Sequence, residues 1–174
     1  MPGLRQAPPL RLFLAVWPDA AAREALLRWR AAARWPAGAA PTPPQQLHLT
    51  LHFIGAVPAA RLAEVTEFLA VPCAPCRIGF DRVEAWPRGL AVLGASAVPP
   101  ALQALHGRLA EALRALDLPV EARPWRPHVT LARRAAGAVL PPQAPSGDWL
   151  VRGYALVQSA GGYRTLRHYP ATGA

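Results

Sequence analysis

One four-residue pattern occurs twice in this chain, each time inside a run of residues that favours a β-strand. The copies are His48-Leu49-Thr50-Leu51 and His128-Val129-Thr130-Leu131, which lie 80 residues apart. Side chains alternate between the two faces of a strand, so the histidine and threonine of each copy share one face. The aliphatic residues then point into a core, and the two polar pairs meet in one space if the strands lie opposite each other.

The segments that precede the two copies also repeat. The first copy follows an apolar strand over 11–16, a helix over 20–33 and a proline-rich loop over 35–46. The second follows a helix over 100–117, with leucines at three- and four-residue steps, and a proline-flanked stretch over 123–127. This repeat predicts two lobes related by a pseudo-twofold axis.

Apolar periodicity and turn residues predict the remaining elements. We expect a strand over 47–54 closed by Gly55, a helix over 58–70, strands over 76–83 and 90–93 that form a hairpin, a strand over 128–132, a loop over 135–147, and strands over 149–158 and 163–169. At 174 residues the chain is long enough for one domain with a substantial core.

The charge of the chain favours anionic partners. The formal net charge is +9, and all 19 basic residues are arginine. A basic surface attracts a polyanion such as RNA, and the arginine fork can hold two phosphate oxygens at once. A compositional bias toward Ala, Arg and Pro explains the charge equally well, so charge supports a nucleic-acid partner without establishing it.

Cysteine usage and hydropathy bear on the compartment. Cys73 and Cys76 form a single C-x-x-C without the second pair that a structural zinc site needs, so we expect a buried or loop thiol pair in a reducing compartment. The apolar run 12–17 is too short for a secretory signal, and the uncharged stretch 89–107 is interrupted by two prolines. We expect a cytoplasmic protein without a membrane span.

Two imidazoles and two hydroxyls facing one space suit the cleavage of a cyclic phosphodiester. The reaction needs a base that deprotonates water and an acid that protonates the leaving ribose oxygen, and two imidazoles near neutral pH can supply one role each. The threonine hydroxyls would donate hydrogen bonds to the non-bridging oxygens as negative charge develops. This scheme requires no metal and no cofactor.

The other histidines offer an alternative to this scheme. His52 shares the parity of His48, so alternation directs it toward the same cleft or its rim. A metal site formed by His48, His52 and His128 is conceivable, but no carboxylate near either motif would complete or orient it. We expect His106 and His168 to lie on the surface.

The chain resembles the 2H phosphoesterase superfamily, specifically the LigT-like RNA 2',3'-cyclic phosphodiesterases, which are also called 2'-5' RNA ligases or ThpR. The resemblance covers nearly the whole chain and is carried by RLFLAVWP at 11–18, QLHLTLHFIG at 46–55, RPHVTLAR at 126–133, and ALVQS at 155–159 followed by Tyr163. It implies an α+β, bilobal pseudo-twofold fold in which two antiparallel sheets line a central cleft with helices outside. Residues 1–174 would form a single domain of two interleaved lobes.

The resemblance also implies roles for individual residues. The reaction would open a 2',3'-cyclic phosphate to a 2'-phosphomonoester, with His48 as proton donor and His128 as proton acceptor. Thr50 and Thr130 match the phosphate-binding threonines, and Arg133 matches the final arginine of the second motif. The expected partners are RNA ends or nucleoside 2',3'-cyclic phosphates, and we expect a monomer.

Arg133 and several aromatic residues are less directly placed by the pattern. Arg133 has the opposite parity to His128, so it reaches the cleft only if the strand ends or bulges near Ala132. Arg126 has the matching parity and is equally well explained as a solvated charge at the rim. The family's aromatic residue before the first motif is absent, and the segment between residues 159 and 163 is shortened. RNA bases commonly stack on aromatic rings, so the candidates for substrate binding are His52 and Arg126 together with the aromatic residues Phe13, Trp35, Trp125 and Tyr163.

Two other interpretations remain open. The chain could be a basic RNA-binding module that grips phosphate without turnover. Alternatively, the same chemistry could act on a small cyclic phosphate or a 2'-5' oligonucleotide, or join RNA ends through 2'-5' ligation. Specificity resides in the surrounding loops over 35–46 and 135–147, whose sequences do not reveal it.

Overall fold

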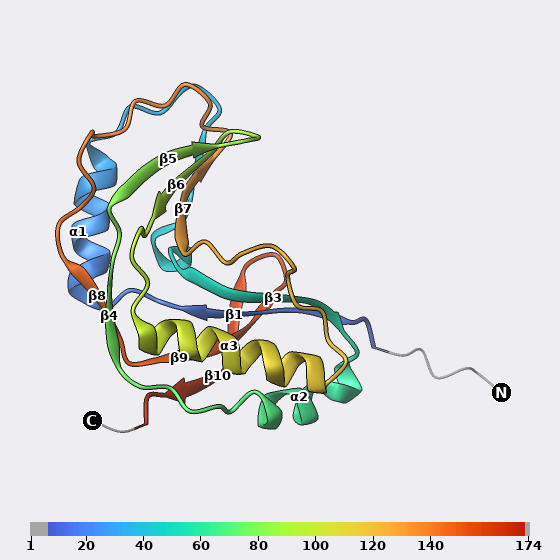
Figure 1. Ribbon diagram of the computed structural model, residues 1–174. Helices are drawn as coiled ribbons and strands as arrows, with labels where there is room; N and C mark the ends of the chain where they lie inside the picture. The colour runs from blue at the N-terminus through green and yellow to red at the C-terminus, as the bar shows by residue number, and fades with distance from the viewer. Residues whose placement is uncertain (1–6, 173–174) are drawn as a thin grey trace.

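The computed structural model describes residues 7–172, with three α-helices and ten strands among them (Figure 1). The strands are β1 (Leu10–Val16), β2 (Ala40–Pro41), β3 (Leu49–Val57), β4 (Cys76–Gly79), β5 (Arg82–Trp86), β6 (Leu90–Gly94), β7 (His128–Arg133), β8 (Asp148–Val151), β9 (Gly153–Ser159) and β10 (Tyr163–Pro170). The helices are α1 (Ala20–Ala31), α2 (Leu62–Phe68) and α3 (Pro100–Ala115), and short 3-10 turns cover Pro44–Gln46 and Ala59–Arg61. The predicted single domain covers residues 1–174, of which residues 1–6 and 173–174 lie outside the described residues.

The strands form two antiparallel halves that meet at one point. One half has the order β10-β9-β1-β3, and the other has the order β7-β6-β5, with β2 also paired to β7. Leu49 of β3 pairs with Val129 of β7, and this pair joins the halves into one eight-stranded sheet. β4 and β8 form a separate two-stranded sheet. The predicted α+β fold with two antiparallel sheets is confirmed.

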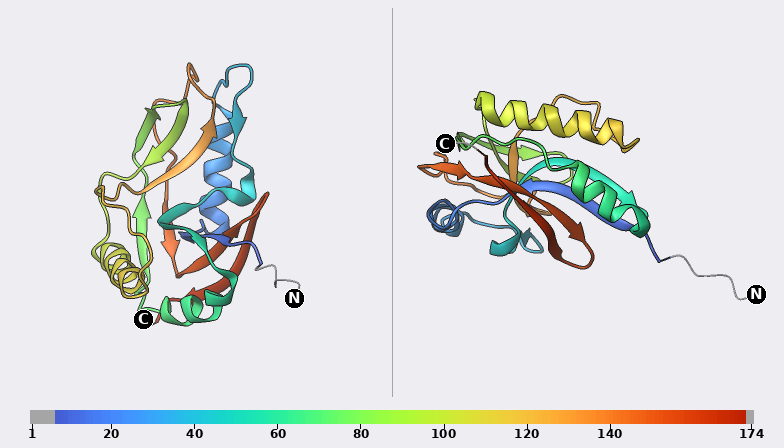
Figure 2. Two further views of the ribbon diagram at one scale, coloured as in Figure 1. Left: turned by 90° about the vertical axis from the view of Figure 1, so that its right-hand side faces the viewer. Right: turned by 90° about the horizontal axis from the view of Figure 1, so that it is seen from below.

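The helices lie outside the sheet, as Figures 1 and 2 show. α3 runs beneath β1 and β3 in Figure 1, and its buried face carries leucines at three- and four-residue steps, including Leu102, Leu105 and Leu109. Asp19 directly precedes α1 as its N-cap, and its carboxylate accepts a hydrogen bond from the Ala22 amide at 2.9 Å. The same carboxylate accepts a hydrogen bond from the Leu150 amide, which attaches α1 to β8.

A single hydrophobic cluster receives side chains from both halves. Leu14 of β1 and Leu93 of β6 are both fully buried in it, as are Leu49 and Val129 at the junction. Cys73 is buried at its edge, Cys76 is half-buried, and both are free thiols whose pKa is raised by burial. A second, small cluster of Phe13, Ala15, Ala155 and Val157 lies apart from the main core.

Three strand predictions were wrong in their boundaries. The strand expected over 76–83 is two strands in different sheets, because the chain turns at Asp81, whose carboxylate accepts a hydrogen bond from the Ser96 amide at 2.8 Å. The strand expected over 149–158 breaks before Gly153, which has φ +145° and where a Cβ would lie 2.3 Å from the Tyr169 carbonyl oxygen. β3 does not end at Gly55 but continues to Val57 through positive φ at the glycine.

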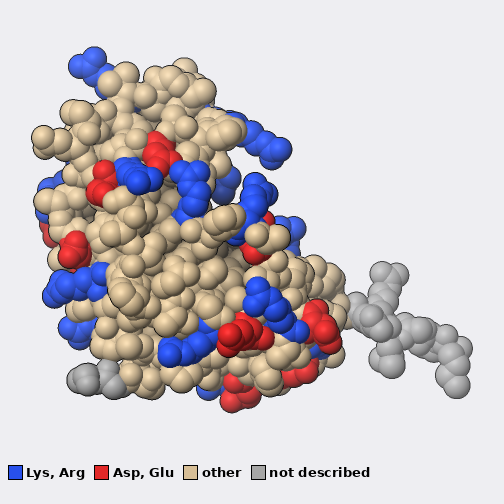
Figure 3. Space-filling view, viewed as in Figure 1, with Lys and Arg blue, Asp and Glu red and all other residues tan. Residues whose placement is uncertain are grey.

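The surface carries its positive charge on several elements. Figure 3 shows arginines gathered on the viewed face around β5 to β7 and near the junction of the two halves. Within residues 7–172, no helix is long and apolar enough to cross a membrane.

Candidate active site

The two motif histidines lie where the halves of the sheet meet. The antiparallel pairing of Leu49 with Val129 places His48 beside Thr130, and by the same register it places the other motif histidine beside the other motif threonine. The paired aliphatic residues are fully buried, so the polar residues occupy the opposite face of both strands. We call the set His48, Thr50, His128 and Thr130 the motif site.

His48 is held by hydrogen bonds on both ring nitrogens. Its Nδ1 lies 2.6 Å from the Gln46 carbonyl oxygen, to which Nδ1–H donates, and its Nε2 lies 3.0 Å from the Thr50 hydroxyl. The carbonyl bond fixes the tautomer with the proton on Nδ1 and directs the Nε2 atom toward the threonine.

Aromatic rings surround the imidazole of His48. The ring centroids of Phe13, Trp17 and Tyr163 lie 5.2, 5.3 and 5.3 Å from that of His48, and the Trp17 indole is stacked on it. Trp17 is itself fixed by a hydrogen bond from its indole N–H to the Gln45 carbonyl at 3.0 Å. Phe13 and Tyr163 are candidates from the sequence, whereas Trp17 is an addition from the structure, although it lies in the family-matching segment over 11–18.

His128 is held in the same way as His48. Its Nδ1 donates to the Arg126 carbonyl, two residues earlier, at 2.7 Å. The Trp86 ring lies 4.4 Å from its imidazole, and the Arg126 guanidinium lies 4.7 Å above the same Trp86 ring. Glu84 accepts a hydrogen bond from that guanidinium at 2.9 Å and another from the indole N–H of Trp86.

Glu84 and Trp86 were missed at the sequence level. Both lie on β5 at positions of the same parity, so alternation over a strand at 82–86 would have placed them on one face. Nothing in their spacing relates that face to residue 128, because β5 and β7 are not neighbours and are separated by β6. Arg126, a candidate for substrate binding, is exposed and engaged by Glu84 beside His128.

Burial lowers the pKa of both motif histidines. For His48 the positive charges of His128 and Arg133 lower the pKa further, and the hydrogen bond to the backbone carbonyl opposes them. For His128 the hydrogen bond to the Arg126 carbonyl opposes the effect of burial. The guanidinium of Arg126 lowers the pKa of His128, and the carboxylate of Glu84 raises it. The electrostatic coupling of His48 to His128 and Arg133 accords with their convergence on one space.

A bulge in β7 turns Arg133 to the face of the motif site. Consecutive residues of β6 pair with Thr130 and Ala132, so Leu131 is the extra residue. Leu131 and Ala132 are both buried in the main core, and Arg133 returns to the side of Thr130. From alternation alone, Arg133 reaches the site only if β7 ends or bulges near Ala132. The bulge is present, and its extra residue is Leu131, directly before Ala132.

β3 carries the matching bulge, and the prediction that His52 faces the motif site is wrong. Consecutive residues of β1 pair with Thr50 and His52, so Leu51 is the extra residue. His52 is turned to the core face, is only 4% exposed, and donates from Nε2 to the His106 carbonyl at 2.9 Å. The three-histidine metal alternative is not assembled, because His52 lies on the opposite face from His48. Within residues 7–172, no group of three or more His, Cys, Asp or Glu side chains is placed to hold a metal ion.

His106 is not the surface residue that was expected. Its ring is half-buried in a stack between His52, at 4.1 Å, and Trp125, at 4.2 Å. Burial lowers its pKa to about 4, and the neighbouring His52 adds to the effect. Trp125 and Trp35 pack against the main core, and neither is among the aromatic rings that contact His48.

Each motif strand is braced by the loop that precedes the other motif. Thr42 donates from its hydroxyl to the Thr130 carbonyl at 2.8 Å, and its amide donates to the Leu131 carbonyl at 2.8 Å. In the other direction, the indole N–H of Trp125 donates to the Thr50 carbonyl at 3.2 Å. The pseudo-twofold relation thus extends to the contacts that support the motif threonines.

The comparisons with known proteins agree with this geometry. The model of the 2'-5' RNA ligase superfamily matches residues 17–159. A protein named RNA 2',3'-cyclic phosphodiesterase from Thermus thermophilus is 36% identical over 166 residues, and the alignment covers 86% of this chain and 82% of the relative. A protein of the same name from Escherichia coli is 31% identical, and the alignment covers 93% of this chain and 94% of that relative. The crystal structure of E. coli LigT in apo form has a TM-score of 0.83 at 29% identity, and covers 96% of this chain and 100% of LigT. The chain therefore belongs to the 2'-5' RNA ligase superfamily.

Proposed function

We propose that this chain hydrolyses RNA 2',3'-cyclic phosphates to 2'-phosphomonoesters, with His48 as general acid and His128 as general base. The general reaction is supported by sequence similarity, because two relatives that cover most of the chain bear the name RNA 2',3'-cyclic phosphodiesterase. The observation that carries the mechanism is the pairing of Leu49 with Val129, which brings both motif histidines to one face of the sheet.

The proposed step balances without a further reactant. His128 takes a proton from water on Nε2 as the water oxygen attacks phosphorus. The bond from phosphorus to the ribose 3' oxygen breaks, and His48 gives that oxygen its Nε2 proton. The phosphate remains on the 2' oxygen. The locked Nδ1–H bonds of both histidines support these roles because they leave Nε2 as the reactive nitrogen on each ring.

The charge that develops on the non-bridging oxygens requires donors around the phosphate. The hydroxyls of Thr50 and Thr130 lie on the same face as the histidines, and the Arg133 guanidinium supplies a permanent positive charge. These groups are the proposed phosphate ligands. Each is carried by a β-strand and supported by a bulge or a brace, which suits a site that must be organised in advance.

The aromatic wall beside His48 suits the base of the terminal nucleotide. Phe13 and Tyr163 contact the imidazole and each other, with centroids 4.9 Å apart, and Tyr163 is 39% exposed. Phe53 holds the position in the first motif that Arg133 holds in the second, and it is 68% exposed beside Phe13. An RNA base can stack on such rings without a requirement for one base.

The same geometry accommodates 2'-5' ligation. If the 5'-hydroxyl of a second RNA replaces water, His128 takes its proton, the 3' oxygen leaves with a proton from His48, and a 2'-5' phosphodiester forms. We propose ligation as a secondary activity that depends on the exclusion of water and on the second RNA end.

The test is product analysis with histidine variants. Wild-type protein in excess chelator should open adenosine 2',3'-cyclic phosphate to 2'-AMP alone. His48→Ala and His128→Ala should each lower kcat roughly a thousandfold, whereas Gln103→Ala on the exposed face of α3 should have no effect. Circular dichroism and the thermal midpoint would establish that each variant is folded.

Three outcomes would contradict the proposal: a 3'-phosphate product, a requirement for added metal, or substantial turnover by either histidine variant. A folded wild-type protein that retains RNA but shows no turnover would favour the alternative of a binding module. Turnover of other cyclic phosphates with higher kcat/KM than nucleoside 2',3'-cyclic phosphates would leave the mechanism intact and change the substrate.

A further inference from the structure

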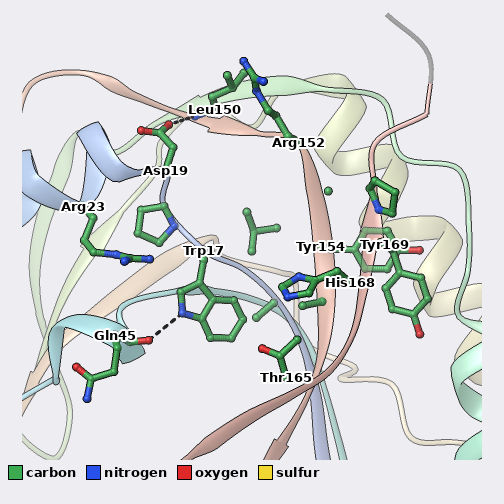
Figure 4. Close-up of a pocket in the computed structure, with 16 residues that line it drawn as sticks. Trp17, Asp19, Arg23, Gln45, Leu150, Arg152, Tyr154, Thr165, His168 and Tyr169 are labelled. Carbon is green, nitrogen blue, oxygen red and sulfur yellow. Dashed lines mark hydrogen bonds between the residues drawn. The ribbon is translucent and has the colours of Figure 1, made fainter.

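A pocket that His48 does not line begins at Trp17 (Figure 4). Its volume is about 610 Å³, within the range of sites that hold small ligands. We call it the Trp17 pocket; its lining comes from the end of β1, the start of α1, the 3-10 turn before β3, and strands β8, β9 and β10. None of the motif residues belongs to this lining.

The Trp17 pocket adjoins the motif site through shared structure. The Trp17 indole lines the pocket and is stacked on the His48 imidazole, so one side chain contacts both places. Gln45, another lining residue, directly precedes Gln46, whose carbonyl fixes His48. Ala15 and Ala155 line the pocket and pack with Phe13 in the small apolar cluster, so the floor of the pocket continues toward the aromatic wall beside His48.

Two arginines that line the Trp17 pocket have no ion-pair partner among the described residues. Arg23 and Arg152 make no ion pair or side-chain hydrogen bond with any residue between 7 and 172, and the buried Nε of Arg23 has no acceptor there. The lining also contains His168. Asp19 is the one carboxylate in the lining, and its two oxygens already accept hydrogen bonds from the Ala22 and Leu150 amides.

Other lining groups suit a nucleoside. Trp17 offers an aromatic surface, and the Thr165 hydroxyl offers a hydrogen bond (Figure 4). Tyr154 and Tyr169 form a fixed wall, because they stack at 4.7 Å and their hydroxyls donate to the backbone carbonyls of Leu69 and Thr66. Unpaired guanidinium groups beside a stacking surface are the combination that holds a single-stranded nucleic acid without sequence preference.

We propose that the Trp17 pocket binds the nucleotide on the 5' side of the terminal cyclic phosphate, with Arg23 and Arg152 on its phosphodiester. This inference rests on the proposed function. A nucleoside 2',3'-cyclic phosphate at the end of an RNA is joined to the rest of the strand only through its 5' oxygen. The strand must therefore leave the motif site in one direction, and the adjoining cationic pocket lies beside the aromatic wall proposed for the terminal base.

The test compares substrates of different length in charge variants. Adenosine 2',3'-cyclic phosphate occupies only the motif site, whereas a trinucleotide that ends in the same cyclic phosphate also reaches the Trp17 pocket. Wild-type protein should prefer the trinucleotide in kcat/KM by roughly tenfold, the equivalent of one or two charge-assisted hydrogen bonds. The double variant Arg23→Gln, Arg152→Gln should lose most of this preference and keep its activity on the mononucleotide.

A matched control removes the same charge elsewhere. Arg108 and Arg114 are exposed on α3 and outside the lining of the Trp17 pocket, so Arg108→Gln, Arg114→Gln should preserve the length preference. If the control loses the length preference as much as the pocket variant does, the preference comes from the overall charge, and the inference about the Trp17 pocket is wrong. A wild type without length preference, or a pocket variant that retains it, would also overturn the inference. If wild-type protein does not open even the mononucleotide, it is the proposed function that fails.

Discussion

At the scale of single residues, the two motif histidines share one device. Each donates a hydrogen bond from Nδ1–H to the carbonyl oxygen two residues earlier in the chain, at 2.6 Å for His48 and 2.7 Å for His128. The backbone just before each strand therefore selects the tautomer and fixes the ring. The rings differ in their neighbours, because His48 lies near the Arg133 charge and His128 lies near both Arg126 and Glu84.

These neighbours predict the pH dependence of the reaction. The general base His128 must be neutral, so kcat/KM falls as pH drops below its pKa, and the general acid His48 must be protonated, so kcat/KM falls as pH rises above its pKa. Both pKa values are lowered from 6.5, chiefly by burial. We expect a bell-shaped profile of kcat/KM for the mononucleotide with its maximum below pH 6.5. A maximum well above neutral pH would contradict the assignment.

The Arg133 charge provides a second check on the same profile. Because this charge lowers the pKa of His48, Arg133→Gln should move the alkaline limb to higher pH, in addition to reducing kcat/KM through the lost phosphate contact. Arg133→Lys keeps the charge and should leave the limb near its wild-type position. Equal profiles for the glutamine and lysine variants would indicate that Arg133 acts on phosphate alone.

At the scale of elements, the loops before the motifs support the opposite strands. Thr42 holds the carbonyls of Thr130 and Leu131 beside the bulge in β7, and Trp125 holds the Thr50 carbonyl beside the bulge in β3. A bulge interrupts the regular ladder locally, and these donors supply hydrogen bonds to carbonyls beside each interruption. These hydrogen bonds therefore help to position the motif threonines.

Removal of one brace should affect catalysis more than stability. Thr42→Val deletes the hydroxyl donor at nearly constant volume, and we expect a loss of about 1 kcal/mol in stability with a fall in kcat of roughly tenfold and little change in KM. Thr42→Ser retains the donor and should restore kcat. A valine variant with wild-type kcat would show that the Thr130 carbonyl needs no fixed partner.

The bulges also mark the limit of sequence-based prediction. Alternation placed His48, Thr50, His128 and Thr130 on one face because each pair precedes its bulge. It failed at His52, which follows the extra residue in β3. A bulge is set by pairing with a neighbouring strand, β1 for the first motif and β6 for the second, and no local propensity encodes that pairing.

Long-range contacts explain the other differences from the sequence-based prediction. The strands over 76–83 and 149–158 read as continuous because their residues favour β structure throughout. Their breaks depend on contacts with distant residues, Ser96 for the turn at Asp81 and Tyr169 for the close approach at Gly153. Trp86 and Trp17 were overlooked for the same reason, since each contacts a motif histidine from a strand or turn far away in sequence.

At the scale of the whole molecule, the two halves share a core although their strands meet at one pair. The main cluster contains Leu14 from the half of β1 and Leu93 from the half of β6, both fully buried, and Leu49 and Val129 connect them. The chain also alternates between the halves, so that neither is continuous in sequence. We propose that the described residues unfold as one domain.

Core truncations in each half test this proposal. Leu14→Ala and Leu93→Ala each remove a fully buried side chain and should each lower the free energy of unfolding by about 2–5 kcal/mol. If the halves form one cooperative unit, each variant shifts a single transition as a whole, with circular dichroism and tryptophan fluorescence in agreement. Val139→Ala, at a side chain that is 63% exposed, should leave the transition unchanged. Two transitions, with each variant displacing only one of them, would show that the halves fold independently; the motif site would then be an interface between two domains, and its geometry would depend on their docking rather than on a shared core.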